Sequence, residues 1–240
     1  MVNIALFAPL PLVIPISLCL FEPMGLCLAP MKTRVKICGL TRPGDVSAAI
    51  DAGAAFLGFI VECPSKRRLS VAEAARLAPS RLSAARVAVT VNPSDDLIAR
   101  IMAEMKPDYI QLHGDETPAR AAEIARMCPV IKAVGIASDD DMKTAETYAG
   151  IAEFILYDAK PPKGESVRGG HGIAIDWNII ARAPTPKIFA VAGGLTPDNV
   201  AHAMTATRAP ILDVSSGVEA SAGVKDTLKI TAFMKAVEHG

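Results

Sequence analysis

Short apolar runs recur along the chain after Thr33, and segments with helical patterning separate them. Near-continuous apolar runs are typical of parallel strands buried on both faces, because helices cover both sides of such a sheet. The pattern predicts eight strands, at residues 34–38, 56–61, 86–91, 109–113, 130–136, 154–158, 188–192 and 211–215. Regular alternation of strands and helices indicates an α/β fold.

The segments between the apolar runs carry signals for helix starts. A Ser, Thr or Asn near a Pro satisfies free amide groups and presets the backbone of the first turn. Such signals occur at Thr41, Asn92, Thr117 and Thr196. Eight strand–helix units predict a single (β/α)8 TIM barrel with eight parallel strands. The alternative is a doubly wound open sheet, but the turn after Gly39 lacks the G-x-G-x-x-G spacing common there.

The first thirty residues differ from the rest, with several prolines, one acid and no Lys or Arg. A secretory signal normally has a basic start and an A-x-A-like cleavage site, and prolines interrupt the apolar run that a spanning helix needs. We interpret residues 1–30 as a non-barrel extension upstream of a natural start at Met31 or Met24, with a targeting peptide as the alternative. Residues 31–240 form the predicted catalytic barrel domain.

Composition narrows the class of ligand. The chain is 51% hydrophobic and its formal net charge is zero, so disorder is excluded and no overall field attracts nucleic acid or a membrane. We therefore expect a small-molecule substrate, with no nucleic-acid or membrane partner. Five scattered cysteines without a C-x-x-C pair fit neither a disulfide framework nor a zinc cluster, which favours a cytoplasmic location.

Cys38 ends the first predicted strand, where barrels of this kind carry catalytic groups. Side chains alternate along a strand, so Lys36 shares a face with Cys38. An ammonium near the thiol would favour the thiolate, the reactive form. The alternative is that Cys38 is a small residue buried in the core.

Asp158 ends the sixth predicted strand. A carboxylate in this position is often a helix cap or a solvated loop residue. The Gly- and Lys-rich stretch over residues 159–172 favours a functional interpretation, because long loops in compact domains are usually functional. We expect this loop, which contains His171, to form a lid over the acid.

Glycine-rich turns follow the last two predicted strands. The first contains Gly193 and Gly194, and the second contains Ser215, Ser216 and Gly217. Glycines let backbone amides approach an anion, and serines add hydroxyl donors. Barrels commonly bind phosphate after strands seven and eight, so the two turns together predict a phosphorylated substrate.

Three further polar residues fall at the same end of the predicted strands. Arg67 follows the second strand, where its guanidinium could fork onto a substrate carboxylate or simply be a solvated basic side chain. His113 lies at the end of the fourth strand and Asp213 lies within the eighth. We expect them to support the site rather than to carry the chemistry.

These motifs together resemble the phosphoribosylanthranilate isomerase family of tryptophan biosynthesis. Its markers are found here at residues 36–39, 111–114, 158 with 169–172, 192–199, 213–219 and 223–226. The resemblance implies an Amadori rearrangement of N-(5-phosphoribosyl)anthranilate to 1-(2-carboxyphenylamino)-1-deoxyribulose 5-phosphate, without cofactor or metal. It also implies Cys38 as general base and Asp158 as general acid. A monomer or a homodimer is expected.

Two departures from the family pattern leave questions open. The family usually has Ser-Pro-Arg after the second strand, whereas Ser65-Lys-Arg67 is followed here by Arg68, so either arginine could meet the substrate carboxylate. His171 stands where the family usually has Thr. The nearest rival, the Amadori isomerase of histidine biosynthesis, uses an aspartate in the position of Cys38, and a non-catalytic phosphate-binding module would be expected to lose the acid or the base.

Overall fold

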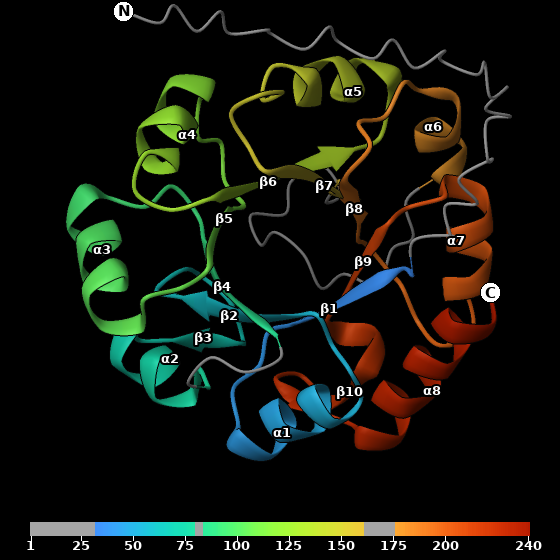
Figure 1. The fold of residues 1–240 in the computed structure, drawn as a ribbon, viewed down its shortest axis with the longest axis horizontal. Helices are drawn as coiled ribbons and strands as arrows, with labels where there is room; N and C mark the ends of the chain where they lie inside the picture. Colours follow the sequence, from blue (N-terminus) through green and yellow to red (C-terminus); the bar gives the residue numbers. More distant parts are fainter. Residues whose placement is uncertain (1–31, 80–83, 161–175) are drawn as a thin grey trace, which may run out of the picture. The chain divides into compact units, whose positions relative to one another are not determined.

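The computed structural model describes residues 32–79, 84–160 and 176–240. In these residues, eight parallel strands form a closed barrel inside a ring of helices (Figure 1). The strands are β1 (Arg34–Cys38), β2 (Phe56–Val61), β4 (Ala85–Thr90), β5 (Tyr109–Leu112), β6 (Val130–Ile136), β7 (Phe154–Ala159), β8 (Phe189–Val191) and β9 (Ile211–Val214). They pair in the order β1-β9-β8-β7-β6-β5-β4-β2, and β2 pairs again with β1. The predicted TIM barrel is therefore confirmed.

The barrel interior is apolar at one end and polar at the other. Phe56, Tyr109 and Phe154 are the first residues of β2, β5 and β7, and their ring centroids lie 5.9 to 6.1 Å apart. These edge-on and tilted rings fill the end where the strands begin. The polar interior side chains, Lys36 and Asp213 among them, lie further along the strands. The fold thus restricts polar chemistry to the carboxyl ends of the strands.

A second apolar core lies between the sheet and the helices, and residues such as Ile37, Leu57 and Leu112 are completely buried there. The helices are α1 (Pro43–Asp51), α2 (Val71–Leu77), α3 (Asp95–Arg100), α4 (Pro118–Ala125), α5 (Asp139–Glu146), α6 (Trp177–Arg182), α7 (Val200–Thr207) and α8 (Thr227–His239). A π-helical turn at Ile101–Met105 continues α3. None of the helices in the described part of the chain combines the length and the apolar character needed to cross a membrane.

The observed strand boundaries agree with the prediction for β1, β2 and β6 and differ by a residue or two elsewhere. His113, Ala192 and Ser215 were predicted as strand ends but lie just beyond β5, β8 and β9. The backbone amides of His113 and Ala192 still donate to the Thr90 and Tyr157 carbonyl oxygens, both at 2.8 Å, so the last hydrogen bonds of the barrel reach these residues. Small elements that the pattern did not predict are β3 (Arg68–Leu69), a 3-10 turn (Ser216–Val218), β10 (Glu219–Ser221) and β11 (Val224–Lys225).

Three of the four predicted helix starts are misplaced. Only Thr117 caps its helix as predicted, accepting a hydrogen bond from the Arg120 amide at 3.2 Å. Thr41 instead donates its hydroxyl to the Gly223 carbonyl oxygen, and Asn92 accepts from the Asp115 amide. The amide of Thr196 donates to Asn199, and α7 begins only after that residue. In each case a polar side chain, that of Thr41, Asn92 or Asn199, holds a loop together at the carboxyl end of a strand.

Residues 1–31 and 161–175 lie outside the described residues, and so do the predicted extension and the predicted lid with His171. The domain boundary near residue 31 stays a prediction. The described part of the chain from Lys32 onward forms one compact unit by itself.

Candidate active site

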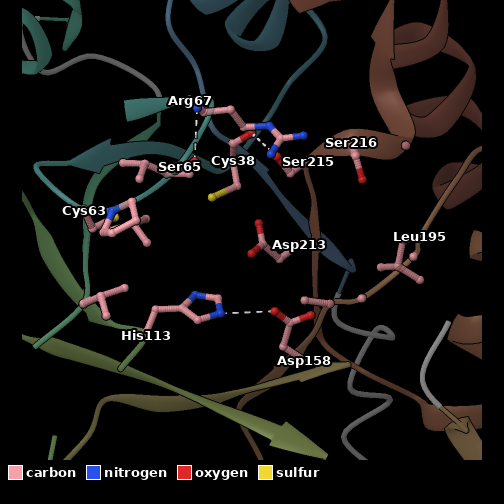
Figure 2. A pocket seen from close by; sticks show the side chains of 18 residues that line it. Cys38, Cys63, Ser65, Arg67, His113, Asp158, Leu195, Asp213, Ser215 and Ser216 are labelled. Atoms are coloured by element: carbon pink, nitrogen blue, oxygen red, sulfur yellow. Dashed lines mark hydrogen bonds and ion pairs between the residues drawn. The ribbon is translucent and has the colours of Figure 1, made fainter. Parts of the chain in front are cut away.

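One cavity opens at the carboxyl ends of the barrel strands, and all ten predicted site residues line it. They are Cys38, Arg67, His113, Asp158, Gly193, Gly194, Asp213, Ser215, Ser216 and Gly217. Figure 2 shows Cys38 and Asp158 pointing into this cavity from opposite sides. Parallel strands bring their carboxyl ends together, which is why residues far apart in the sequence meet here. The individual roles of these residues remain predictions.

Cys38 lies beside a buried ion pair. Lys36 Nζ donates to both carboxylate oxygens of Asp213, at 3.0 and 3.1 Å, and the Lys36 side chain is completely buried. Burial alone would lower the pKa of Lys36, but the charges of Asp213 and Cys38 raise it above the ordinary value. The Lys36 ammonium is therefore charged and already has a counter-ion.

Gly58 on β2 makes room for this arrangement. A Cβ atom at Gly58 would lie 2.8 Å from Cys38 Sγ and 3.1 Å from Lys36 Nζ, so the thiol and the ammonium share the space over this glycine. Burial raises the pKa of the Cys38 thiol, and the Asp213 charge adds to this, while Lys36 opposes it. Lys36 thus lowers the pKa of the Cys38 thiol, as expected from the sequence, burial has the larger and opposite effect, and the thiolate itself stays a prediction.

Asp158 has a backbone amide and a histidine as its hydrogen-bond partners. Its Oδ1 accepts from the Ala159 amide at 2.8 Å, and its Oδ2 lies 3.1 Å from His113 Nε2. The other imidazole nitrogen of His113, Nδ1, lies 2.9 Å from the side-chain amide nitrogen of Gln111. His113 thus contacts the predicted acid directly, and Gln111 contacts His113 from within the barrel.

Arg67 lines the cavity, whereas Arg68 is exposed and does not. The Arg67 guanidinium donates through Nε and Nη2 to the two carboxylate oxygens of Glu219, both at 2.7 Å. These bonds raise the pKa of Arg67, and they help to keep the pKa of Glu219 below its ordinary value although burial opposes this. Lys225 Nζ donates to Glu219 as well, at 2.9 Å, and burial lowers the pKa of this lysine.

The two glycine-rich turns lie against each other. Gly193 and Gly194 have φ angles of 85° and 65°, a backbone conformation that glycine adopts without strain. A Cβ atom at Gly217 would collide with the Leu195 carbonyl oxygen, so only glycine permits this close approach. Ser215 donates its hydroxyl to the Cys38 carbonyl oxygen at 3.0 Å, so this hydroxyl ties the second turn to β1.

Sequence reasoning missed three buried polar residues around the site, namely Gln111, Glu219 and Lys225. All three fall inside the motifs at residues 111–114, 213–219 and 223–226, which was the available signal. Their partners could not be deduced, because Glu219 meets an arginine 152 positions away in the sequence. No group of three or more metal-ligating side chains occurs among the residues described.

The closed barrel and the polar cavity at the carboxyl ends of its strands define a TIM-barrel enzyme. A family model described as N-(5'phosphoribosyl)anthranilate (PRA) isomerase matches residues 35–236. The chain therefore belongs to the phosphoribosylanthranilate isomerase family, and the predicted family and enzyme class are confirmed.

Individual relatives agree with this assignment. The chain is 46% identical over 209 residues to N-(5'-phosphoribosyl)anthranilate isomerase of Caulobacter sp. (strain K31), covering 85% of this chain and 98% of the relative. It is similar to the crystal structure of phosphoribosyl anthranilate isomerase from Thermotoga maritima, with a TM-score of 0.77, 34% identity and coverage of 87% and 100%. A further crystal structure, with a TM-score of 0.73 and 32% identity over 87% of this chain and 100% of the other, holds reduced 1-(o-carboxyphenylamino)-1-deoxyribulose 5-phosphate.

Proposed function

We propose that this chain catalyses the Amadori rearrangement of N-(5-phosphoribosyl)anthranilate in tryptophan biosynthesis, with Asp158 as general acid and Cys38 as general base. Family membership supports the reaction. The observation that carries the roles is the placement of a carboxyl group and a thiol on opposite sides of one cavity, next to two glycine-rich turns. A sugar phosphate held by those turns would lie between the acid and the base.

The first step opens the ribose ring. Asp158 donates a proton to the ring oxygen, the bond from that oxygen to C1 breaks, and the anilino nitrogen forms an iminium with C1. The ring oxygen becomes a hydroxyl group, and the electron pair of the acid's O–H bond stays on Asp158. Hydrogen bonds from the Ala159 amide and from His113 then stabilise the carboxylate.

The second step removes the proton from C2. The Cys38 thiolate takes this proton, the C2–H electron pair forms the C1–C2 double bond, and the iminium becomes an enolamine. Tautomerisation of the enolamine gives the ketone. A raised thiol pKa makes Cys38 a stronger base once it is ionised, and Lys36 next to it stabilises the thiolate when it forms.

Binding groups fix the two ends of the substrate. We assign the phosphate to the backbone amides of Gly194, Ser216 and Gly217, where the turns meet. Glu219 accepts hydrogen bonds from Nε and Nη2 of Arg67. We assign the remaining guanidinium nitrogen, Nη1, to the anthranilate carboxylate. With both ends held in this way, the ribose would lie between the acid and the base.

The setting of the reaction follows from the same assignment. We propose a cytoplasmic enzyme that works on a small phosphorylated substrate without metal, cofactor, nucleic acid or membrane. Both a monomer and a homodimer fit this proposal, and one similar structure is described as monomers generated from dimeric phosphoribosylanthranilate isomerase of Thermotoga maritima.

Turnover of the fluorescent substrate tests the proposal. The wild-type protein should make phosphoribosylanthranilate fluorescence decay well above the uncatalysed rate. Cys38→Ser and Asp158→Asn should each lower kcat by on the order of a hundredfold, as loss of a general acid or base does. Cys63→Ser is the matched control, because it alters a second thiol that lines the cavity, and its kcat should stay close to wild type.

Two outcomes would contradict the proposal. Absence of turnover by the wild-type protein would contradict the proposed activity itself. Near-normal kcat in Cys38→Ser or in Asp158→Asn would remove that residue from its role while leaving the reaction in place.

A further inference from the structure

Gln111 is a completely buried residue of β5, and its side chain forms a hydrogen bond with one other side chain among the described residues. Its amide nitrogen lies 2.9 Å from His113 Nδ1. Its side-chain oxygen, Oε1, is buried and has no hydrogen-bond partner among the residues that the structure describes. A buried polar atom without a partner is rare in native proteins and calls for an explanation. The one hydrogen bond that the Gln111 side-chain amide makes is to His113.

The Gln111 hydrogen bond fixes where the His113 proton resides. A side-chain amide nitrogen only donates, so His113 Nδ1 must accept and carries no proton. The proton of the neutral imidazole is then on Nε2, which points at Asp158 Oδ2 at 3.1 Å. With the Ala159 amide on Oδ1, each Asp158 oxygen accepts one hydrogen bond.

We propose that Gln111 is a positioning residue of the isomerisation, holding His113 in the tautomer that donates to Asp158. This proposal rests on the proposed role of Asp158 as general acid. When the O–H bond of Asp158 breaks and its proton passes to the ring oxygen, the electron pair stays on the carboxylate. The His113 Nε2–H group then stabilises the charge that has just formed, which lowers the barrier to proton donation.

The opposite tautomer would work against the acid. It would require Gln111 to turn its oxygen toward Nδ1, and it would leave a lone pair on Nε2 facing the Asp158 carboxylate. The Thr90 hydroxyl donates to the Gln111 backbone oxygen at 3.2 Å, which anchors the residue without occupying its side chain. The other titratable groups near Asp158 are Asp213 from β9, with its partner Lys36, and Cys38 from β1. The two imidazole nitrogens of His113 contact Gln111 and Asp158.

Nitrogen NMR of the histidine side chains tests the tautomer directly. The chain has four histidines, so loss of one set of signals in His113→Asn assigns the residue. Wild-type His113 should carry a proton on Nε2 and none on Nδ1. In Gln111→Glu the new carboxylate requires a donor, so Nδ1 should become protonated. In Gln111→Met, which has similar size and no donor, both tautomers should be populated.

Steady-state kinetics test the consequence. Gln111→Glu should lower kcat about tenfold or more, the effect of losing one hydrogen bond to a charged group. Gln111→Met should have a smaller effect in the same direction. KM should stay within about twofold in both, because Gln111 does not line the cavity. Gln111→Met brings no charge into the barrel, so its tautomer and kcat still test the proposal if Gln111→Glu does not fold.

The outcomes separate this proposal from the function on which it rests. A wild-type proton on Nδ1, or Gln111 variants with unchanged tautomer and unchanged kcat, would overturn the role of Gln111 even if the enzyme is fully active. A protein with the expected tautomers but no turnover would instead overturn the proposed function.

Discussion

Cys38 and Asp158 face the same cavity, but their surroundings are of opposite kinds. The Cys38 side is built from buried charges: Lys36 with Asp213, and Arg67 and Lys225 with Glu219. The Asp158 side is built from the Ala159 backbone amide and the His113 imidazole, with no lysine or arginine bonded to Asp158 among the described residues. A thiol in a dry pocket ionises only if cations are near, whereas a carboxyl group needs only oriented dipoles to stabilise its anion. The difference matches what each group has to do.

The contrast also separates stability from catalysis. A buried charge that loses its partner destabilises the fold, because the remaining charge is left without water or counter-ion. A neutral hydrogen bond that is lost leaves a smaller penalty behind. Changes on the Cys38 side should therefore be visible in unfolding experiments, and changes on the Asp158 side should be visible mainly in kinetics.

Removing Lys36 should give the largest effect on stability. Lys36→Met leaves the Asp213 carboxylate buried and unpaired, and it should lower the free energy of unfolding by about 3–5 kcal/mol. Replacing both partners, as in Lys36→Met with Asp213→Leu, removes the uncompensated charge and should recover most of this loss. Urea unfolding of the two variants measures the difference.

The stabilities of these two variants test whether buried charges matter on the Cys38 side of the cavity. If Lys36→Met alone is as stable as the double variant, the ion pair contributes nothing and the charged character of the Cys38 side has no structural consequence. The double variant should still be a poor catalyst, since Cys38 has then lost its ammonium neighbour.

Gly193 offers a smaller test on the Asp158 side. Its φ of 85° and a Cβ position 2.6 Å from the Ala159 nitrogen leave no room for a side chain. Gly193→Ala should destabilise the protein by about 1–3 kcal/mol, and it should disturb the amide that donates to Asp158. Gly44→Ala is the control, because nothing lies within 4 Å of a Cβ there. Thermal unfolding and kcat should fall together in the first variant and stay unchanged in the second.

The sequence was sufficient to predict the barrel and the membership of the site. Strand ends are local features, and a parallel barrel brings all eight of them together, so Cys38 and Asp158 could be placed in one cavity without coordinates. The same argument placed the turn at Gly193 beside the turn at Gly217. Boundaries differed by one residue at some strand ends, as at His113 and Ser215, and at the starts of β4 and β8.

The pairing of polar side chains could not be predicted in this way. Lys36 was expected to lower the pKa of Cys38, but it also forms an ion pair with Asp213. The relative size of the two interactions depends on distances that a sequence pattern does not contain. Arg67 was predicted to bind the substrate carboxylate, but two of its guanidinium nitrogens already donate to Glu219. Gln111 falls in the motif at residues 111–114, but the contact of its side-chain amide with His113 could not be deduced from the sequence.

The smallest expected change is a shift in the ionisation of Cys38. Burial and the Asp213 charge raise the pKa of this thiol, and Lys36 lowers it. The thiolate fraction therefore increases only as the pH rises above the ordinary thiol value of about 8.5, and alkylation of Cys38 by iodoacetamide should accelerate over that range. Asp213→Asn removes the charge that opposes the thiolate, so the inflection should move to lower pH, whereas Lys36→Met should move it higher. Peptide mass spectrometry follows Cys38 separately from the other thiols. An inflection that is the same in all three proteins would mean that burial alone controls the thiol, and that the charges around Cys38 stabilise the fold without tuning the base.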